Sequence, residues 1–255
     1  MPRFFIRKDA VTENMIRITG EDAHHISRSL RMAVGESVTV CDMQKTEYDC
    51  VLDRFEPDAV YARILSAHAS DTEPPFEATV FQALPKGEKF DSIIQKSVEC
   101  GVSHIVPFES ERCIVRVKAD AEAKKTERRA RIAAEAAKQS GRGLLPDVLP
   151  TVSFDEMLTL ATAADVCLFC YEGDGTVPLG AILPVEDLKA RIKNGETPKI
   201  AIVVGSEGGF SISEASRARD AGVLMCGLGK RILRTETAAT FVLGCLVYAL
   251  ELGET

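Results

Sequence analysis

The stretch KIAIVVGSEGGFSISEASRARDAG, residues 199–222, contains a strand, a glycine loop and a helix in direct succession. Lys199–Gly205 is a short continuous apolar run, which is typical of a central parallel strand that is covered on both faces. Ser211 stands three residues before Glu214, which is the spacing of a capping box, so a helix is expected over Ser211–Ala221. A strand that leads into a helix in this way is the repeating unit of an α/β fold.

The same alternation of strand and helix extends in both directions from this stretch. Asp165–Tyr171 is a second continuous apolar run, and Glu88–Cys100 has apolar residues at the i, i+3, i+4 spacing of a helix. We therefore expect residues 78–255 to form an α/β domain with a mostly parallel sheet. The other strands expected are Ala78–Leu84, Val102–Phe108 and Val223–Leu228, and the other helices are Ala121–Ser140, Phe154–Ala163 and Thr235–Glu251.

Residues 1–70 show a different pattern, with closely spaced strands and one helix. The helix is expected over Glu21–Leu30, after the cap-like Thr19, and the arrangement favours a small β-barrel. The polar stretch Ser70–Pro75 ends in two prolines, which resist both helix and central strand, so we place a linker at residues 71–77. The strands expected are Arg3–Arg7, Met15–Ile18, Ser37–Asp42, Glu47–Arg54 and Ala59–His68.

Composition narrows the class of protein. The 255 residues are 45% hydrophobic and 27% charged, which predicts a buried core. The longest apolar stretch, Ala238–Leu250, is shorter than the roughly 20 residues of a membrane-spanning helix. The first ten residues hold no apolar run long enough for a signal peptide. We therefore expect a cytoplasmic protein with no membrane partner.

The net charge of −7 is unevenly distributed along the chain. Residues 112–142 contain ten basic and four acidic residues, although the protein as a whole is acidic. A local basic stripe of this kind can bind a phosphate backbone, and it can equally be a solvated helix face.

The eight cysteines do not predict a metal site. Cys167 and Cys170 form a single C-x-x-C, and no second pair of ligands stands at a spacing suitable for zinc. Most of the cysteines lie in apolar runs and are interpreted as buried free thiols. No metal is expected.

Two loops at the carboxyl ends of expected strands could carry chemistry, because open parallel sheets bind ligands at that edge. Gly205–Gly209 combines flexible backbone with one acid, Glu207, although an ordinary strand–helix turn would have a similar composition. The second loop, Leu228–Ala239, has cations just before a helix, where they oppose the helix dipole. That placement suggests that Arg231 or Arg234 is held for an anionic ligand.

These two loops carry a specific resemblance. Gly205-x-Glu207-Gly208-Gly209-Phe210-Ser211, followed by Leu228-Gly229-x-Arg231-Ile232-Leu233-Arg234-x-Glu236-Thr237-Ala238, resembles the bacterial 16S ribosomal RNA uridine-N3 methyltransferases of the SPOUT class. Shorter blocks in the same order also resemble this family, and they include Lys86-Gly87-Glu88-Lys89 and Gln139-Ser140-Gly141-Arg142. Ser206 departs from the family, which commonly has proline there.

The resemblance implies a fold and a set of partners. We expect a PUA-like RNA-binding barrel over 1–70, and a SPOUT methyltransferase domain with a C-terminal trefoil knot over 78–255. The implied cofactor is S-adenosyl-L-methionine, and the implied partners are 16S rRNA in the small ribosomal subunit and a second copy of the chain. The residues expected to bind the cofactor are Phe169, Tyr171, Val204, Gly205, Ser206, Glu207, Gly208, Gly209, Leu228, Gly229, Ile232, Leu233, Arg234 and Thr237. Those expected to contact RNA are Arg28, Arg31, Lys86, Lys89, Arg112 and Arg142.

Methylation at N3 of uridine places its own demands on the residues. The nitrogen bears a proton and is a poor nucleophile until that proton leaves. We expect Arg234 to stabilise the charge that develops on the uracil oxygens, and Glu236 or Glu207 to accept the proton. Three alternatives compete with this function: a SPOUT relative that methylates ribose 2′-O, a non-enzymatic RNA-binding assembly factor, and a nucleotide-dependent oxidoreductase. The missing dinucleotide-binding fingerprint disfavours the last of these.

Overall fold

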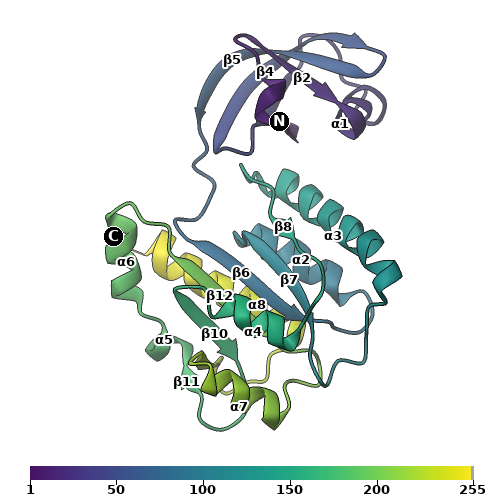
Figure 1. Cartoon of the computed structure of the whole chain (residues 1–255). Coiled ribbons are helices and arrows are strands. Elements are labelled where there is room, and N and C mark those ends of the chain that lie inside the picture. The colour runs from purple at the N-terminus through teal and green to yellow at the C-terminus, as the bar shows by residue number, and fades with distance from the viewer. Residues whose placement is uncertain (254–255) are drawn as a thin grey trace. The chain divides into compact units, whose positions relative to one another are not determined.

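The computed structural model describes residues 1–253 and divides the chain into two units (Figure 1). The N-terminal unit comprises Met1–Glu73 together with Ala137–Leu145. The C-terminal unit comprises Pro74–Ala136 and the chain from Pro146 onward. The division at Glu73/Pro74 lies within the linker expected at 71–77.

The N-terminal unit is built on a five-stranded sheet in the order β1-β3-β4-β5-β2. β1 pairs with β3 in parallel, and the other pairs are antiparallel. Its core holds alternate residues of these strands, such as Phe4, Ile16, Val38 and Leu52. The elements are β1 (Arg3–Phe5), η1 (Lys8–Ala10), β2 (Met15–Thr19), α1 (Gly20–His24), the π-helix η2 (His25–Ser29), β3 (Ser37–Cys41), β4 (Thr46–Glu56) and β5 (Ala59–Ala69).

The helical segment expected over Glu21–Leu30 is present over Gly20–Ser29, but its cap and its second half differ from expectation. Thr19 is the last residue of β2, where it pairs with Ala59, and it is the N-cap residue of α1, but its side chain makes no capping hydrogen bond. The α-helical turns end at His24, and the chain continues as a π-helix to Ser29. A cap-like residue type was therefore not sufficient to predict a cap.

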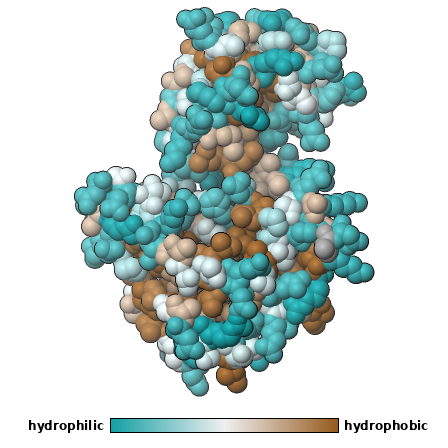
Figure 2. All heavy atoms as spheres, viewed as in Figure 1, coloured by the Kyte–Doolittle hydropathy of each residue, from teal (hydrophilic) through white to brown (hydrophobic). Residues whose placement is uncertain are grey.

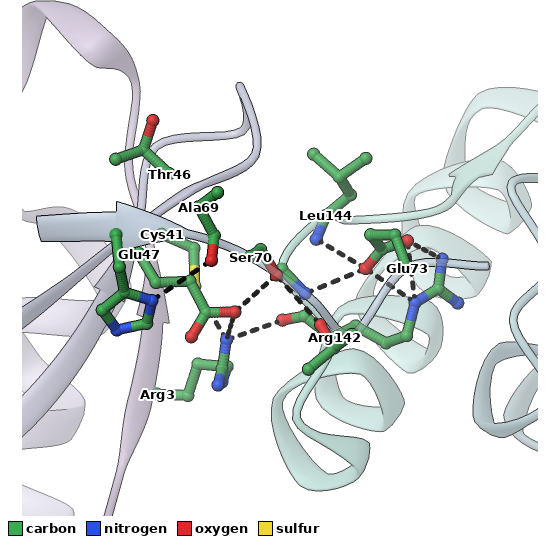
Figure 3. Close-up of polar contacts among 12 residues, drawn as sticks. Arg3, Cys41, Thr46, Glu47, Ala69, Ser70, Glu73, Arg142 and Leu144 are labelled. Atoms are coloured by element: carbon green, nitrogen blue, oxygen red, sulfur yellow. Dashed lines mark hydrogen bonds and ion pairs between the residues drawn. The ribbon is translucent and has the colours of Figure 1, made fainter. Parts of the chain in front are cut away.

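The segment Ala137–Leu145 belongs to the N-terminal unit through a buried ion pair (Figure 3). Nε of Arg142 lies 2.9 Å from Oε1 of Glu73, and the same oxygen accepts hydrogen bonds from the backbone of Gly143 and Leu144 at 2.9 and 3.2 Å. Arg3 donates to the carbonyl of Arg142 at 3.2 Å. The sequence pattern did not predict that residues so far along the chain would complete this unit.

The C-terminal unit contains a sheet in the order β11-β13-β10-β12-β6-β7-β8, with β9 also paired to β7, and every recorded pairing in it is parallel. The prediction of an α/β domain with a parallel sheet is confirmed. The elements are β6 (Glu77–Ala83), α2 (Lys89–Glu99), β7 (His104–Glu109), α3 (Ala119–Ser140), β8 (Asp147–Val148), β9 (Val152–Ser153), α4 (Phe154–Ala161), β10 (Val166–Cys170), β11 (Val177–Pro178), α5 (Leu179–Ile182), α6 (Val185–Lys193), β12 (Lys199–Val204), α7 (Ile212–Asp220), β13 (Leu224–Gly227), α8 (Thr235–Val247) and the π-helix η3 (Tyr248–Leu252).

The predicted capping box of α7 is present. The Ser211 side chain accepts from the backbone of Glu214, and the Glu214 carboxylate accepts from the backbone of Ser211. The sequence did not predict β8, β9 or β11, because two-residue strands leave no periodicity to detect.

The last helix is a core element of this unit. α8 packs against α2, β6 and β12, and its Ala239, Val242 and Leu246 have no exposed surface. By length and composition alone, Thr235–Leu252 could cross a membrane, but buried core helices pass the same test. Figure 1 shows α8 behind the sheet and α4 in front of it, and α4 contacts β6, β7 and β12.

Candidate functional site

A cavity of about 460 Å³ lies in the C-terminal unit, at the carboxyl ends of β10, β12 and β13. Open parallel sheets bind ligands at this edge, because loops that follow neighbouring strands converge there. Three loops line the cavity, one after each strand. The lining residues are Cys170–Gly173 and Thr176, Val204–Phe210, and Gly227–Leu233, together with Arg112, Ile212, Thr235 and Ala238.

The Gly205–Gly209 loop presents backbone to this cavity. Gly209 has φ +62° and closes a turn by donating from its N–H to the Ser206 carbonyl at 2.9 Å. A Cβ at Gly205 would lie 3.1 Å from the Phe210 ring and 3.3 Å from Gly209 backbone. The Phe210 ring packs on Phe169, with centroids 4.2 Å apart, so a tight aromatic contact supports the loop from below.

The loop after β13 forms a second wall with a different character. Gly229 has φ +102°, which lets the chain turn sharply after the strand. Beyond that turn, Lys230, Arg231 and Ile232 are exposed, and Ile232 is 81% exposed. This wall therefore offers two cations and one apolar side chain beside the backbone-lined floor.

Gln82 joins these loops beneath the cavity, a role that sequence analysis did not anticipate. Its side chain is fully buried at the end of β6. Its amide nitrogen donates to the Thr235 hydroxyl at 2.9 Å and to the Gly205 carbonyl at 3.3 Å. A buried glutamine in an otherwise apolar strand, FQAL, was the available signal. Buried polar side chains are rare without partners, so such a residue indicates a hydrogen-bonded junction.

The two acids predicted to act on the substrate lie near one lysine. Nζ of Lys89 is 2.8 Å from Oε1 of Glu207 and 3.7 Å from Oε2 of Glu236. Burial raises the pKa of Glu207, but the Lys89 ammonium and the Lys86 backbone N–H outweigh it, so the pKa is lowered overall. Glu207 lines the cavity, whereas Glu236 lies in the first turn of α8 beside it.

Arg234 precedes α8 as its N-terminal cap residue and is exposed. Its backbone carbonyl accepts from Thr237 and Ala238, while its side chain has no recorded hydrogen bond or ion pair within residues 1–253. An exposed guanidinium at this position can turn toward an anionic group that enters from solvent.

Most residues expected to bind the cofactor line the cavity. Three do not: Phe169 is buried under Phe210, and Arg234 and Thr237 are exposed outside the lining. The loop after Tyr171 was expected to bind the cofactor as a segment, but its Gly173 and Thr176 were not named individually, and neither was Thr235. The residues that were expected and line the cavity are Tyr171, Val204, Gly205, Ser206, Glu207, Gly208, Gly209, Leu228, Gly229, Ile232 and Leu233.

The residues expected to contact RNA occupy unlike environments. Arg28, Arg31 and Lys86 are exposed. Arg112 is exposed at the cavity, where it donates to the Gly208 carbonyl at 3.1 Å. Each of these four side chains is exposed on the unit that contains it, so a polyanion can reach it.

Lys89 and Arg142 are already paired with acids. The Lys89 ammonium is bonded to Glu207, and the Arg142 guanidinium is buried against Glu73, with side-chain exposures of 5% and 10%. A contact between Arg142 and RNA would require this ion pair to open.

The cysteines behave as core thiols. All eight are free, and burial raises the pKa of Cys167 to about 12. Cys170 and Cys226 face each other in register on β10 and β13. Over the part of the chain that the structure describes, no group of three or more histidine, cysteine or acidic side chains could hold a metal ion.

Comparisons with known proteins cover the whole chain. Residues 72–247 match the model of an RNA methyltransferase domain, and residues 18–65 match that of an RNA methyltransferase PUA domain. The ribosomal RNA small subunit methyltransferase E of Bacillus subtilis (strain 168) is 34% identical over 255 residues, which cover 99% of this chain and 98% of that relative.

Two solved structures with a bound cofactor are similar over nearly their full length. One is a ribosomal RNA small subunit methyltransferase E from Neisseria gonorrhoeae bound to S-adenosyl methionine, with 31% identity and a TM-score of 0.83. The other is a methyltransferase from Legionella pneumophila in complex with the same cofactor, with 30% identity and a TM-score of 0.84. Each match covers 97% of both chains.

Proposed function

The chain belongs to the family of ribosomal RNA small subunit methyltransferases E, and on that premise we propose that it methylates N3 of one uridine in 16S rRNA, with S-adenosylmethionine as methyl donor. The observation that carries the proposal is the cavity at the carboxyl ends of β10, β12 and β13, which three glycine-containing loops line. The relatives with a bound cofactor support this choice of donor.

The residues around the cavity fit S-adenosylmethionine. The backbone of Gly205–Gly209 and Leu228–Gly229 offers hydrogen-bonding groups for an adenine and a ribose, and a Cβ at Gly205 would crowd the loop. Lys230 and Arg231 are exposed beside it and can pair with a carboxylate. When bound, the cofactor supplies an electrophilic methyl group.

The protein's own side chains have to prepare the uridine. Its N3 must lose a proton before it can attack, and negative charge then develops on the neighbouring oxygens. Arg234 is the exposed cation nearest the start of α8, and in this proposal it stabilises that charge. Glu207 and Glu236 are the carboxylates available to accept the proton.

The N-terminal unit supports an RNA substrate. It contains the match to the RNA methyltransferase PUA domain, and its Arg28 and Arg31 are exposed. N3 lies on the Watson–Crick edge, so the target uridine has to be unpaired or flipped out. A separate unit that holds the surrounding RNA meets this requirement.

A homodimer is part of the proposal. Phe241, Tyr248 and Leu252, on α8 and η3, are exposed by 41%, 72% and 70%. Large apolar side chains that lie exposed together mark interaction sites. Figure 2 views the C-terminal unit from the side opposite α8, where hydrophobic and hydrophilic residues are interspersed. A monomer in sedimentation at micromolar concentration would contradict this part. The trefoil knot, the cytoplasmic location and the absence of a metal requirement stay predictions.

The deciding experiment is methyl transfer from labelled S-adenosylmethionine to small ribosomal subunits that lack the modification, followed by reverse transcription. An N3-methyl group blocks base pairing, so a stop at one uridine is expected. Label without a stop would indicate a ribose or another non-blocking position. No label and no cofactor binding by calorimetry would favour a non-enzymatic assembly factor.

Arg234→Ala tests the role assigned to the arginine. Turnover should fall by at least tenfold while the cofactor dissociation constant stays within twofold, because the lost interaction belongs to the transition state. Full turnover in this variant would refute the assignment.

A further inference from the structure

Lys89 lies between two carboxylates from distant parts of the C-terminal unit. Its ammonium contacts Glu207, which lies in the loop after β12, and Glu236, which lies in the first turn of α8. The sequence places Lys89 among candidate RNA contacts. With 34% of its side chain exposed and its ammonium 2.8 Å from a carboxylate, it is poorly placed to bind a phosphate.

The carboxylate of Glu207 is held from two sides. Both of its oxygens accept from the backbone N–H of Lys86, at 3.2 and 3.3 Å, and Oε1 also accepts from Lys89. Hydrogen bonds to the charged form of a carboxylate make it a weaker proton acceptor. Glu207 is therefore suited to shape the edge of the cavity rather than to take a proton.

Glu236 is held much less firmly. Its Oε2 atom is buried and has no hydrogen-bond partner among the described residues, and the Lys89 ammonium lies 3.7 Å away. The side chain as a whole is 25% exposed, so its exposed surface belongs to atoms other than Oε2. This carboxylate keeps acceptor capacity that Glu207 has already used.

We propose that Lys89 is a positioning residue that fixes Glu207 at the cavity and holds a cation beside Glu236, so that Glu236 accepts the N3 proton of the substrate uridine. The inference rests on the proposed methyl transfer and selects between the two carboxylates that the sequence left open. In the step, the N3–H bond breaks, the proton goes to a Glu236 oxygen, and the electron pair stays on the uracil.

The charges around Lys89 come from two segments, the loop after β12 and the start of α8. Glu207 and Glu236 raise the pKa of the lysine, and Arg234 lowers it. Loss of the lysine charge removes the cation that lies 3.7 Å from the Glu236 carboxylate, and an opposite charge at that distance favours the ionised form of a carboxylate. The acid limb of the kcat–pH profile should therefore move to higher pH in Lys89→Met.

The first test needs no substrate. Carboxyl carbons of the glutamates are followed by NMR against pH in the unmodified protein and in Lys89→Met. The titration midpoint of Glu207 is expected to rise by at least half a unit, because its carboxylate loses the ammonium that lies 2.8 Å away. An unchanged midpoint would overturn the inference, and this result would stand whether or not the protein methylates RNA.

Kinetics then separate a positioning role from an RNA contact. Lys89→Met should lower kcat by tenfold or more. It should leave unchanged both the KM for the RNA and the salt dependence of RNA binding. Lys89→Arg keeps the positive charge and should restore the acid limb of the kcat–pH profile. If Lys89→Met instead bound RNA more weakly, and the slope of log K against log salt concentration fell by about one, Lys89 would be a phosphate contact.

Lys96→Met provides the matched control. Lys96 lies on the same helix and pairs with Glu99 at 2.9 and 2.8 Å, away from the cavity-lining residues. Its replacement removes one lysine–glutamate pair and should leave the pH profile unchanged. An equal shift in both variants would reveal a general charge effect and would overturn the specific role of Lys89.

Discussion

The hydroxyl of Thr235 donates a 2.6 Å hydrogen bond to the carbonyl of Gly205, thirty residues earlier in the chain. Thr235 begins α8, and Gly205 begins the glycine loop after β12, so this bond joins two walls of the cavity. The amide of Gln82 reaches both groups from below. The walls are therefore held by side-chain chemistry as well as by the strands that carry them.

Thr235→Val should loosen this junction. It removes the donor to Gly205 and the acceptor for Gln82 while it keeps a β-branched side chain of similar size. Loss of two net hydrogen bonds should lower the free energy of unfolding by about 1–3 kcal/mol. Urea denaturation measures the change, and calorimetry should show weaker S-adenosylmethionine binding. Thr235→Ser keeps the hydroxyl and should behave like the unmodified protein. A serine variant with the same losses of stability and cofactor affinity as the valine variant would contradict the explanation.

Gly205→Ala should impair cofactor binding because the new methyl group has no room. Its Cβ would meet the Phe210 ring at 3.1 Å and Gly209 backbone at 3.3 Å, so the loop has to shift. We expect a tenfold or larger increase in the cofactor dissociation constant with a small change in stability. Gly180→Ala is the control, since a Cβ there meets nothing within 4 Å. Unchanged affinity in Gly205→Ala would show that the loop adapts freely.

Arg142→Met should destabilise the N-terminal unit. It leaves the Glu73 carboxylate buried without its cation, and breaking a buried pair in this way costs about 3–5 kcal/mol. The double variant Glu73→Gln/Arg142→Met should recover part of the loss, because no unpaired charge then remains. Urea denaturation of the single and double variants measures the coupling. If Arg142→Met remained stable and only lost RNA affinity, Arg142 would be an RNA contact after all.

The basic face of α3 should bind RNA through its exposed members. Lys124 and Arg131 are exposed, seven residues apart on the helix, whereas Arg128 pairs with Asp91 and Arg129 is buried. Lys124→Glu/Arg131→Glu should weaken RNA binding at least tenfold and reduce its salt slope, because fewer counterions are released. Lys193→Glu/Lys199→Glu makes the same change in net charge on exposed residues elsewhere. Equal losses of RNA affinity in both double variants would show that the net charge of the protein, and not the face of α3, causes the effect.

Acid should destabilise the N-terminal unit through Asp42. Burial raises the pKa of this carboxyl, but Lys8 and the backbone N–H groups of Gln44 and Thr46 outweigh it, so the pKa lies below 3.8 overall. A lowered native pKa stabilises the fold above the unfolded-state value, and the stabilisation is lost as pH falls through the native value. Urea midpoints between pH 7 and pH 3 should therefore fall less steeply in Asp42→Asn. Asp58→Asn, at an exposed turn, should follow the unmodified curve.

Much of this architecture could be predicted from local patterns. The runs Lys199–Gly205 and Asp165–Tyr171 became β12 and β10, and the capping box of Ser211 and Glu214 formed as expected. These predictions succeeded because hydrophobic periodicity and caps depend on residues within a few positions of one another. Thr19 occupies the N-cap position of α1 with the extended backbone that caps adopt, yet its side chain makes no capping hydrogen bond, so residue type alone did not predict the cap.

The candidate site divides along the same line. The sequence by itself determined which loops face the ligand edge, because glycines and charged residues stand directly after apolar strands. Only the tertiary structure decided which charges are available: it pairs Lys89 with Glu207 and Arg142 with Glu73, 118 and 69 residues apart. A pairing between residues so far apart in the chain depends on how strands and helices pack, so local sequence patterns do not predict it.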